Sequence, residues 1–188
     1  MATDRGPTLL AIARGAIAGS LGEPAPPFDA ANWLQEPGAT FVTLQMHGKL
    51  RGCVGSLLAQ RPLREDVETN ACAAAFHDSR FAPLSRHEYP DIEIEVSLLS
   101  TMESLAFENQ KHLLTLLRPG VDGVVLEYGG QRGTFLPQVW EQLPDPKSFL
   151  VQLKQKAGLP ADFWCDGIQI SRYTVAKWRE HEYSTTRR

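Results

Sequence analysis

The sequence predicts an α+β fold with mixed, mainly antiparallel sheets and several helices. Segments with strand alternation occur in clusters, and helical segments separate these clusters instead of following every strand. Strict alternation of strand and helix would favour a parallel sheet. Because 188 residues can form one large core, we expect a single domain over residues 1–188, with its core at 8–178 and short flexible termini.

The composition narrows the kinds of partner and site. With a formal net charge of −3, the chain lacks the basic surface that binds nucleic acid. No apolar run reaches the roughly 18 residues of a membrane helix, and the first residues form a poor signal sequence. We therefore expect a cytoplasmic protein with no nucleic-acid or membrane partner. The cysteines show no metal-binding spacing and nucleotide-binding motifs are absent, so we expect no metal and no cofactor.

The first part of the chain predicts a helix followed by a hairpin. Apolar residues at helical spacing favour a helix at Thr8–Ala18, which the proline-rich segment 23–27 ends. Phe41–Met46 alternates as a half-buried strand does, and its return strand follows Gly48. A three-residue loop, Met46–Gly48, would place glycine at the left-handed position that such loops require.

This loop also predicts the register of the hairpin. Arg51 and Cys53 then lie on one face of the return strand, beside Thr43 of the first strand. A two-residue turn at His47-Gly48 would shift the register by one and bring Arg51 among apolar residues, so we favour the longer loop. The opposite face carries an apolar ridge of Val42, Leu44, Leu50 and Val54, with Leu44 facing Leu50.

The remaining segments continue the α+β pattern. Proline starts a helix at Pro62–Phe76, and Ser85 with Glu88 has the spacing of a capping box. Asp91–Ser100 alternates apolar and acidic residues, which is typical of a strand with one buried face. Further elements are expected as a helix at His112–Leu117, a hairpin at 124–128 and 131–136, a helix from Asp145 to Gly158, and a strand at Ile168–Val175.

The two predicted hairpins share a short pattern. Each turn glycine, Gly48 or Gly129, is followed by arginine, glycine and a small residue that can act as a nucleophile. One hypothesis is that the chain consists of two related halves, and the alternative is a chance match. Related halves would place similar elements around both hairpins. The matching residues are Arg51, Gly52 and Cys53 in the first hairpin and Arg132, Gly133 and Thr134 in the second.

Cys53 and Arg51 are the candidate catalytic residues. Glycines in a strand are costly unless backbone or a ligand comes close, and Gly52 and Gly55 flank this cysteine. An arginine on the same strand face would favour the thiolate. The alternative is an inert buried thiol, because free cysteine is among the most buried residue types.

A loop and a strand supply the other candidates. His77-Asp78 offers a base and a carboxylate to orient it, although an ion pair of Asp78 with Arg80 is the plainer interpretation. Glu93 and Glu95 share a strand face, which we interpret as a solvated surface. The candidate binding residues are Gly52, Thr43, Asp78, Arg80, Arg132 and Thr134.

Together these motifs resemble the AMMECR1 domain family over roughly residues 9–178, and in particular its bacterial branch, AmmeMemoRadiSam system protein A. The most distinctive motif is L-R-G-C-V-G at residues 50–55, in which Arg51, Gly52 and Cys53 match the family, while Val54 and Ser56 are variants. The other matching segments are 38–44, 78–81, 95–100 and 134–140.

The resemblance implies two subdomains around a cleft that carries the motif, and company with Memo-like and radical SAM proteins. It implies no particular activity. Two hypotheses follow for the function. The chain is either a ligand-binding or accessory module, with a small-molecule ligand near Arg51, Gly52 and Cys53, or a cysteine-dependent enzyme with Cys53 as nucleophile.

Overall fold

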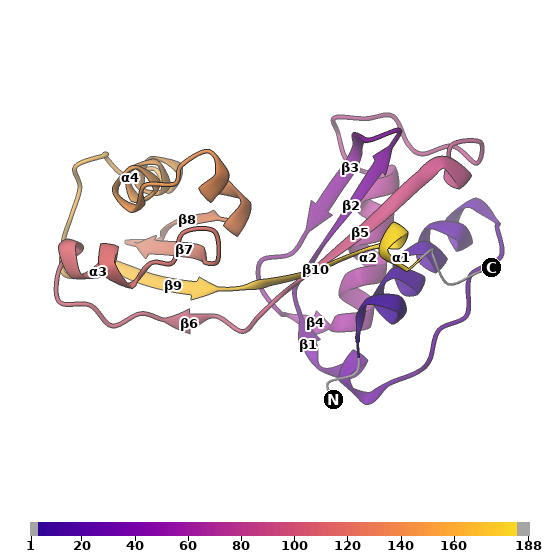
Figure 1. Ribbon diagram of the computed structural model, residues 1–188, viewed down its shortest axis with the longest axis horizontal. Coiled ribbons are helices and arrows are strands. Elements are labelled where there is room, and N and C mark those ends of the chain that lie inside the picture. Colours follow the sequence, from indigo (N-terminus) through magenta and orange to yellow (C-terminus); the bar gives the residue numbers. More distant parts are fainter. Residues whose placement is uncertain (1–3, 184–188) are drawn as a thin grey trace. The chain divides into compact units, whose positions relative to one another are not determined.

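The computed structural model describes residues 4–183 and divides into two compact units (Figure 1). Unit 1 comprises residues 4–99 and 176–183 of this range, and unit 2 comprises residues 100–175. Each unit has its own hydrophobic core. Helices and antiparallel sheets occur in both units, so the predicted α+β fold is confirmed. The expected flexible termini lie partly outside the described residues, and a single folding domain stays a prediction.

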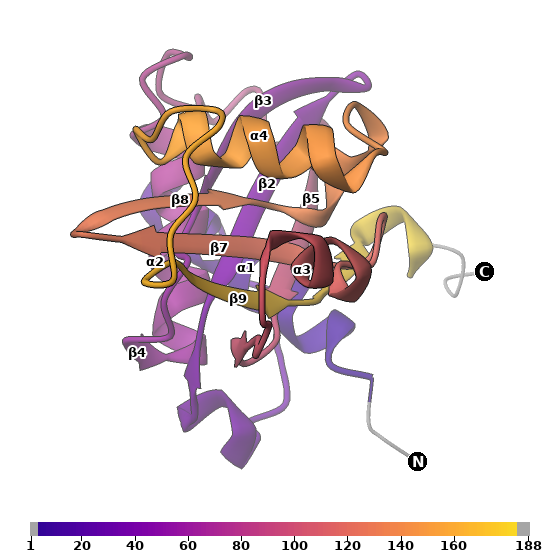
Figure 2. The same cartoon turned by 90° about the vertical axis from the view of Figure 1, so that its left-hand side faces the viewer.

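Unit 1 is a four-stranded sheet with two helices on one face. The strand order is β10 (Val175–Arg179), β5 (Ile92–Leu99), β2 (Thr40–Met46) and β3 (Lys49–Gly55). Helix α2 (Leu63–Phe76) packs on β2 and β3, and α1 (Gly6–Leu21) packs on β5 and on α2 (Figures 1 and 2). The short elements are η1 (Asn32–Gln35), β1 (Pro37–Gly38), β4 (Arg61–Pro62), η2 (Tyr89–Asp91) and η4 (Glu180–Glu182).

The turn between β2 and β3 differs from the prediction. His47 and Gly48 form a two-residue turn in which both residues have positive φ, 52° and 74°, as the tight hairpin turn requires. The prediction of a three-residue loop was therefore wrong. A β-bulge then shifts the register by one residue. Gln45 pairs with Leu50, whereas its neighbour Leu44 pairs with Gly52, which leaves Arg51 without a cross-strand partner.

The bulge inserts Arg51 as an extra residue on β3. Beyond it Thr43 pairs with Cys53, so Cys53 keeps the face that was predicted from the longer loop. Leu50 does not join the apolar ridge, because it pairs with Gln45 and is 44% exposed. The prediction that Leu44 faces Leu50 was wrong because it assumed a hairpin without a bulge.

Unit 2 has the same kind of architecture on a smaller scale. Its strand order is β6 (Glu103–Ser104), β9 (Gln169–Tyr173), β7 (Gly123–Tyr128) and β8 (Gln131–Phe135). Helix α4 (Pro146–Lys156) packs on β8, and Asp145 caps it by accepting a hydrogen bond from the Ser148 N–H at 2.9 Å. The other elements are α3 (Gln110–Leu116) and η3 (Pro137–Glu141).

The two units share one order of elements. In each, a hairpin is followed by a helix that packs on its second strand, and the next strand pairs antiparallel with the first hairpin strand. A Cβ at Gly52 would overlap the Ala74 carbonyl oxygen of α2, and one at Gly133 would crowd the Leu153 carbonyl oxygen of α4. The predicted similarity of flanking topology is confirmed, and superposition of the two hairpins stays a prediction.

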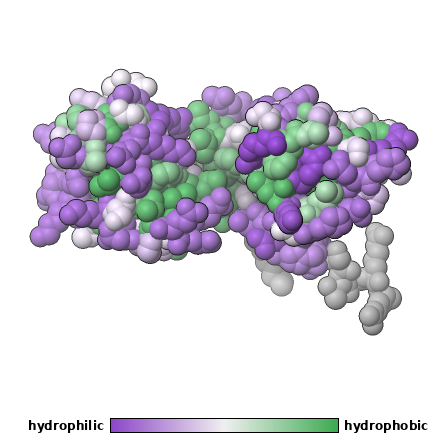
Figure 3. All heavy atoms as spheres, turned by 90° about the horizontal axis from the view of Figure 1, so that it is seen from above, coloured by the Kyte–Doolittle hydropathy of each residue, from purple (hydrophilic) through white to green (hydrophobic). Residues whose placement is uncertain are grey.

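On the face shown in Figure 3, hydrophilic residues alternate with apolar areas. Large hydrophobic side chains that are exposed include Leu50, Leu58 and Val121. Within residues 4–183, no helix is long and apolar enough to cross a membrane.

Candidate functional site

Cys53 lies on the face of the unit 1 sheet that α1 and α2 leave uncovered. Its cross-strand partner is Thr43, whose hydroxyl Oγ1 donates a hydrogen bond to the Cys53 Sγ at 3.2 Å. The neighbouring pair, Val42 and Val54, faces the helices and belongs to the core. The thiol is half-buried. The Cys53 thiol therefore meets a polar side chain on this face of the sheet.

The glycines around Cys53 are explained by packing inside the protein. At Gly52 the backbone of α2 approaches so closely that the Ala74 carbonyl leaves no room for a side chain. At Gly55 a Cβ would overlap the ring of Phe41 on β2. Their presence is therefore not evidence of ligand access.

The backbone of Cys53 is held by two side chains. Its N–H donates to Asp78 Oδ2 at 2.9 Å, and its carbonyl accepts from Arg80 Nη2 at 3.3 Å. Asp78 and Arg80 also pair with each other, with Nη2 and Oδ2 2.7 Å apart. Because β3 is an edge strand, these two side chains take the place of a neighbouring strand at Cys53.

The ion pair between Asp78 and Arg80 shifts the pKa of both groups in the direction that favours their charged forms. The Arg80 guanidinium, and next the Cys53 N–H, hold the pKa of the Asp78 carboxyl well below its usual range. Asp78 in turn raises the pKa of Arg80. The geometry therefore favours the ion-pair interpretation of this loop. His77 is exposed, and its neighbour Asp78 is engaged by Arg80 and Cys53 instead of orienting the imidazole.

Arg51 is directed to the segment that follows α2. Its Nε donates to Glu88 Oε1 at 2.9 Å, its Nη2 donates to the Ala82 carbonyl at 2.9 Å, and its guanidinium lies 5.9 Å from the Phe81 ring centre. Arg51, and next the Ser85 N–H, lower the pKa of Glu88 to about 2. The contact of Ser85 with Glu88 also confirms half of the predicted capping box, with the Ser85 N–H donating at 2.8 Å.

One donor atom of Arg51 is unsatisfied. The residue is 9% exposed, and its buried Nη1 has no hydrogen-bond partner within residues 4–183. Buried donors in native proteins are nearly always paired, so each exception needs an explanation such as a bound water or ligand. Nη1 is therefore a buried donor that an acceptor atom of a bound water or ligand would satisfy.

Sequence reasoning missed Glu95. On β5 it pairs with Thr43, so Cys53, Thr43 and Glu95 form a row across three neighbouring strands. Glu95 is 8% exposed and binds Arg179 at 2.5 Å and Lys177 at 3.4 Å. The interpretation of Glu95 as part of a solvated surface was therefore wrong. The acidic alternation of β5 was visible, but its register with β2 was needed to place it.

A buried polar network below the motif was missed as well. Asp66 on α2 is fully buried and accepts hydrogen bonds from the Thr40 N–H at 2.8 Å, the Thr40 hydroxyl at 2.7 Å and Asn70 Nδ2 at 3.0 Å. Arg61 Nε completes the set at 2.8 Å. Ser56 joins the network through Arg61 Nη2 at 3.0 Å, so the end of the motif is tied to the start of α2.

The predicted site residues divide between the two units. Thr43, Gly52, Asp78 and Arg80 lie with Arg51 and Cys53 in unit 1, whereas Arg132 and Thr134 belong to unit 2. Thr134 Oγ1 lies 3.2 Å from the Tyr173 hydroxyl, and Arg132 pairs with Glu127 at 3.5 Å. These are the contacts of a polar strand face. Within the described residues, no group of three or more His, Cys, Asp or Glu residues is arranged to hold a metal.

The chain matches one family model and is similar to several known proteins. The AMMECR1 family model matches residues 10–178. A protein from Methanothermobacter thermautotrophicus is 38% identical over 170 residues, which cover 88% of each chain. One from Sulfolobus acidocaldarius is 38% identical over 159 residues, 81% of this chain and 70% of its own length. The crystal structure of the uncharacterized protein PH0010 from Pyrococcus horikoshii is 32% identical with a TM-score of 0.78, covering 93% of this chain and 91% of that one.

Proposed function

Because the chain belongs to the AMMECR1 family, we propose that it is a ligand-binding or accessory module whose ligand is held by the segment Arg51–Cys53. The observation that supports this proposal most is the buried Nη1 of Arg51, which has no acceptor within residues 4–183. A ligand oxygen in hydrogen-bond contact with this atom would satisfy it.

The charges around Arg51 indicate which kind of oxygen it would accept. Glu88 already neutralises the guanidinium, and Asp78 neutralises the neighbouring Arg80. A second carboxylate beside Arg51 would meet Glu88 and repel it. A neutral carbonyl or hydroxyl oxygen would instead supply the missing hydrogen bond without adding charge. The ligand class that fits this site is a small neutral or zwitterionic molecule with an accessible carbonyl or hydroxyl group.

The proposal also includes two partner proteins. The resemblance of the motifs to the bacterial branch supports association with a Memo-like and a radical SAM protein in the cytoplasm. Mixing the purified chain with both proteins from one genome, followed by sedimentation velocity, tests this part. A complex of defined stoichiometry supports it, and three independently sedimenting species contradict it.

The second candidate function is a cysteine-dependent enzyme. It is favoured by one observation, the hydrogen bond from the Thr43 hydroxyl to the Cys53 Sγ. In this hypothesis Cys53 is the nucleophile, and Thr43 stabilises its thiolate. Neither hypothesis depends on His77.

One experiment separates the two candidates. The wild type and its Arg51→Lys, Cys53→Ala and Arg64→Lys variants are incubated with the small-molecule fraction of the source cells, and released compounds are compared by mass spectrometry. A binding module retains the same compound in the wild type and in Cys53→Ala. An enzyme retains substrate only in Cys53→Ala and yields product with the wild type. Arg51→Lys loses the compound in both cases, while Arg64→Lys, an exposed control, keeps it.

If Arg51→Lys and the wild type retain identical compounds, Arg51 is not the ligand contact and the proposal fails. The thermal midpoint of each variant shows whether a loss of binding reflects a loss of folding.

A further inference from the structure

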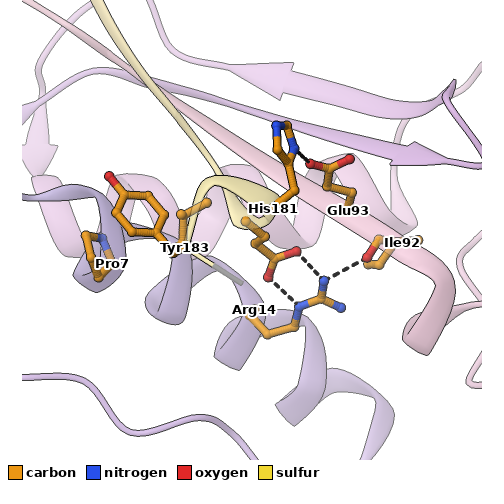
Figure 4. A pocket seen from close by; sticks show the side chains of 8 residues that line it. Pro7, Arg14, Ile92, Glu93, His181 and Tyr183 are labelled. Carbon is orange, nitrogen blue, oxygen red and sulfur yellow. Dashed lines mark hydrogen bonds and ion pairs between the residues drawn. The ribbon is translucent and has the colours of Figure 1, made fainter. Parts of the chain in front are cut away.

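A hollow of about 740 Å³ in unit 1 has its charged groups paired within the chain (Figure 4). Arg14 Nε donates to Glu180 Oε1 at 2.8 Å, and His181 Nδ1 contacts Glu93 Oε1. Nη1 of Arg51, by contrast, has no hydrogen-bond partner within residues 4–183. Ligand access in unit 1 therefore depends on what covers Arg51.

The loop over the motif consists of residues 78–83. It follows α2 and contains neither helix nor strand. Both ends of the loop are fixed, because the His77 N–H donates to the Ala73 carbonyl at 2.9 Å and the Leu84 N–H donates to the Ala75 carbonyl at 2.8 Å. Leu84 is also buried in the core of unit 1. The loop therefore connects two points that are anchored in the fold.

The loop contacts the motif at two residues of β3. Its Asp78 accepts from the Cys53 N–H at 2.9 Å, and its Arg80 donates to the Cys53 carbonyl at 3.3 Å. Its Ala82 carbonyl accepts from Arg51 Nη2 at 2.9 Å. One continuous loop thus covers both Cys53 and Arg51, and movement of this loop would uncover both.

One aromatic ring connects the two contact regions of the loop. The Phe81 ring centre lies 5.5 Å from the guanidinium of Arg80 and 5.9 Å from that of Arg51. Phe81 is half-buried and lies outside the hydrophobic core described for unit 1. Movement of the loop would therefore expose little additional apolar surface. Segments with few buried apolar contacts open at the lowest free energy.

The ion pair of the loop can survive this movement. Asp78 and Arg80 both belong to the loop, with Oδ2 and Nη2 2.7 Å apart, so they can stay paired when the loop leaves β3. Opening breaks the hydrogen bonds to Cys53 and Arg51, and water can replace each of them. The free energy of opening is therefore small compared with that of unfolding unit 1.

We propose that residues 78–83 are a lid that opens locally in the folded protein and admits a ligand to Arg51. This inference rests on the proposed function, because it concerns the same buried donor. Nη1 is buried while the lid is closed, so a ligand oxygen reaches it only when its cover moves. Of the groups that contact Arg51, Glu88 lies beyond the anchored end of the loop, whereas Phe81 and Ala82 belong to the lid.

The Cys53 amide reports on the lid, because it donates to Asp78 of the lid. The Val54 N–H is directed at β2 instead, because N–H directions alternate along an antiparallel strand. Native-state hydrogen exchange of both amides is measured by NMR at increasing urea. We expect Cys53 to exchange faster than Val54 and with little dependence on urea, as a local opening does. Exchange of both amides at one free energy and with one urea dependence would mean that the loop opens only by unfolding, and would overturn the proposal.

Phe81→Ala tests whether the lid moves as a unit, because it leaves the Asp78 acceptor of the Cys53 amide in place. It should speed the exchange of Cys53 about tenfold. The matched control is Phe28→Ala, which removes a half-buried ring outside the lid that lies 5.2 Å from the Arg64 guanidinium. The control should leave Cys53 unchanged. Unchanged exchange in Phe81→Ala, or equal acceleration in both variants, overturns the proposal. If Phe81→Ala does not fold, Phe81→Leu is compared in the same way.

Labelling with phenylglyoxal, a neutral dicarbonyl that reacts with guanidinium groups, measures access to Arg51. Peptide mass spectrometry should show labelling of Arg51 about tenfold faster in Phe81→Ala than in the wild type, and Phe28→Ala should match the wild type. Equal rates in Phe81→Ala and the wild type would show that the loop does not control access, and would overturn the proposal. Neither measurement contains a ligand. A failed lid is therefore distinguished from a failed ligand proposal, in which the lid opens but the wild type retains no compound.

Discussion

The carboxylate of Asp78 accepts a hydrogen bond from the backbone N–H of Cys53 at 2.9 Å, while Arg80 donates to the Cys53 carbonyl at 3.3 Å. The loop after α2 thus occupies the free edge of β3 at the residue that the sequence motif singles out. This relationship connects two segments that are separate in the sequence, and it makes the position of Cys53 depend on a charged side chain.

Replacing Asp78 with alanine should destabilise unit 1. The change leaves the Cys53 N–H without its acceptor and Arg80 without its partner, which costs about 1–3 kcal/mol. Urea unfolding of the variant measures this loss. Asp29→Ala, at an exposed position, is the control and should change the free energy of unfolding by less than about 0.5 kcal/mol. Equal losses in both variants would show that the contact of Asp78 with the Cys53 N–H does not stabilise unit 1.

Acid should weaken the fold through Glu88. Its pKa is lowered to about 2, so its ion pair with Arg51 stabilises the fold above the unfolded-state pKa near 4.3 and is lost as the pH falls toward 2. Because the side chain is 28% exposed, we expect a contribution of only about 1–2 kcal/mol.

The measurement compares urea midpoints of the wild type and Glu88→Gln between neutral and acidic pH. The variant should be less stable at neutral pH, and the two curves should converge in acid. Glu36→Gln, at an exposed position outside any helix, should follow the wild type. Parallel curves for the wild type and Glu88→Gln would show that the pair does not stabilise the fold.

Adding one methyl group at Gly52 should be costly. The Cβ would overlap the Ala74 carbonyl oxygen of α2, and backbone must move to make room, which costs about 2–3 kcal/mol. Gly19→Ala is a contrasting control, because this position in α1 has open space and alanine favours helix by about 0.5–1 kcal/mol. Thermal denaturation should shift in opposite directions in the two variants. A neutral Gly52→Ala would mean that α2 does not approach β3 so closely.

Removing Asp66 should be the most destabilising of these changes. Asp66→Ala leaves the buried Thr40 and Asn70 donors without their acceptor, which costs about 1–3 kcal/mol for each unsatisfied donor, and it removes the partner of Arg61, whose side chain is 34% exposed. Glu36→Ala, at an exposed position outside any helix, should cost less than about 0.5 kcal/mol. Chemical denaturation compares the two, and a loss below about 1 kcal/mol for Asp66→Ala would contradict the role of the network.

Local features of the sequence predicted much of the fold. The helix expected at Pro62–Phe76 is observed at Leu63–Phe76, and the strand expected at Asp91–Ser100 is observed at Ile92–Leu99. Proline at a helix start and alternation along a strand act over a few residues, so they are visible in one sequence.

The missed features depend on distant partners. The bulge at Arg51 accompanies the close approach of Gly52 to α2, and Asp66 meets Thr40 across 26 positions. Glu95 joins Cys53 only through the pairing of β2 with β5. Such contacts arise from tertiary packing, which periodicity and propensity do not encode.

The cysteine-enzyme hypothesis requires that small molecules reach Cys53 in the folded protein, and thiol alkylation tests this requirement most directly. All three cysteines are half-buried; the Thr43 hydroxyl donates to the Cys53 Sγ at 3.2 Å, whereas the Ser20 hydroxyl lies farther, at 3.6 Å, from the Cys72 Sγ. Cys72 lies between α1 and α2, 3.6 Å from the Ala16 carbonyl. A hydroxyl donor favours the reactive thiolate.

Limited labelling with iodoacetamide near neutral pH, analysed residue by residue by mass spectrometry, should modify Cys53 before Cys72 and Cys165. Thr43→Val should slow the labelling of Cys53, while Thr69→Val, at an exposed position on α2, should not. If Cys165 is labelled first and Cys53 reacts only after the protein unfolds, then Cys53 is a structural thiol, the cysteine-enzyme hypothesis is wrong, and the ligand-binding or accessory module is favoured.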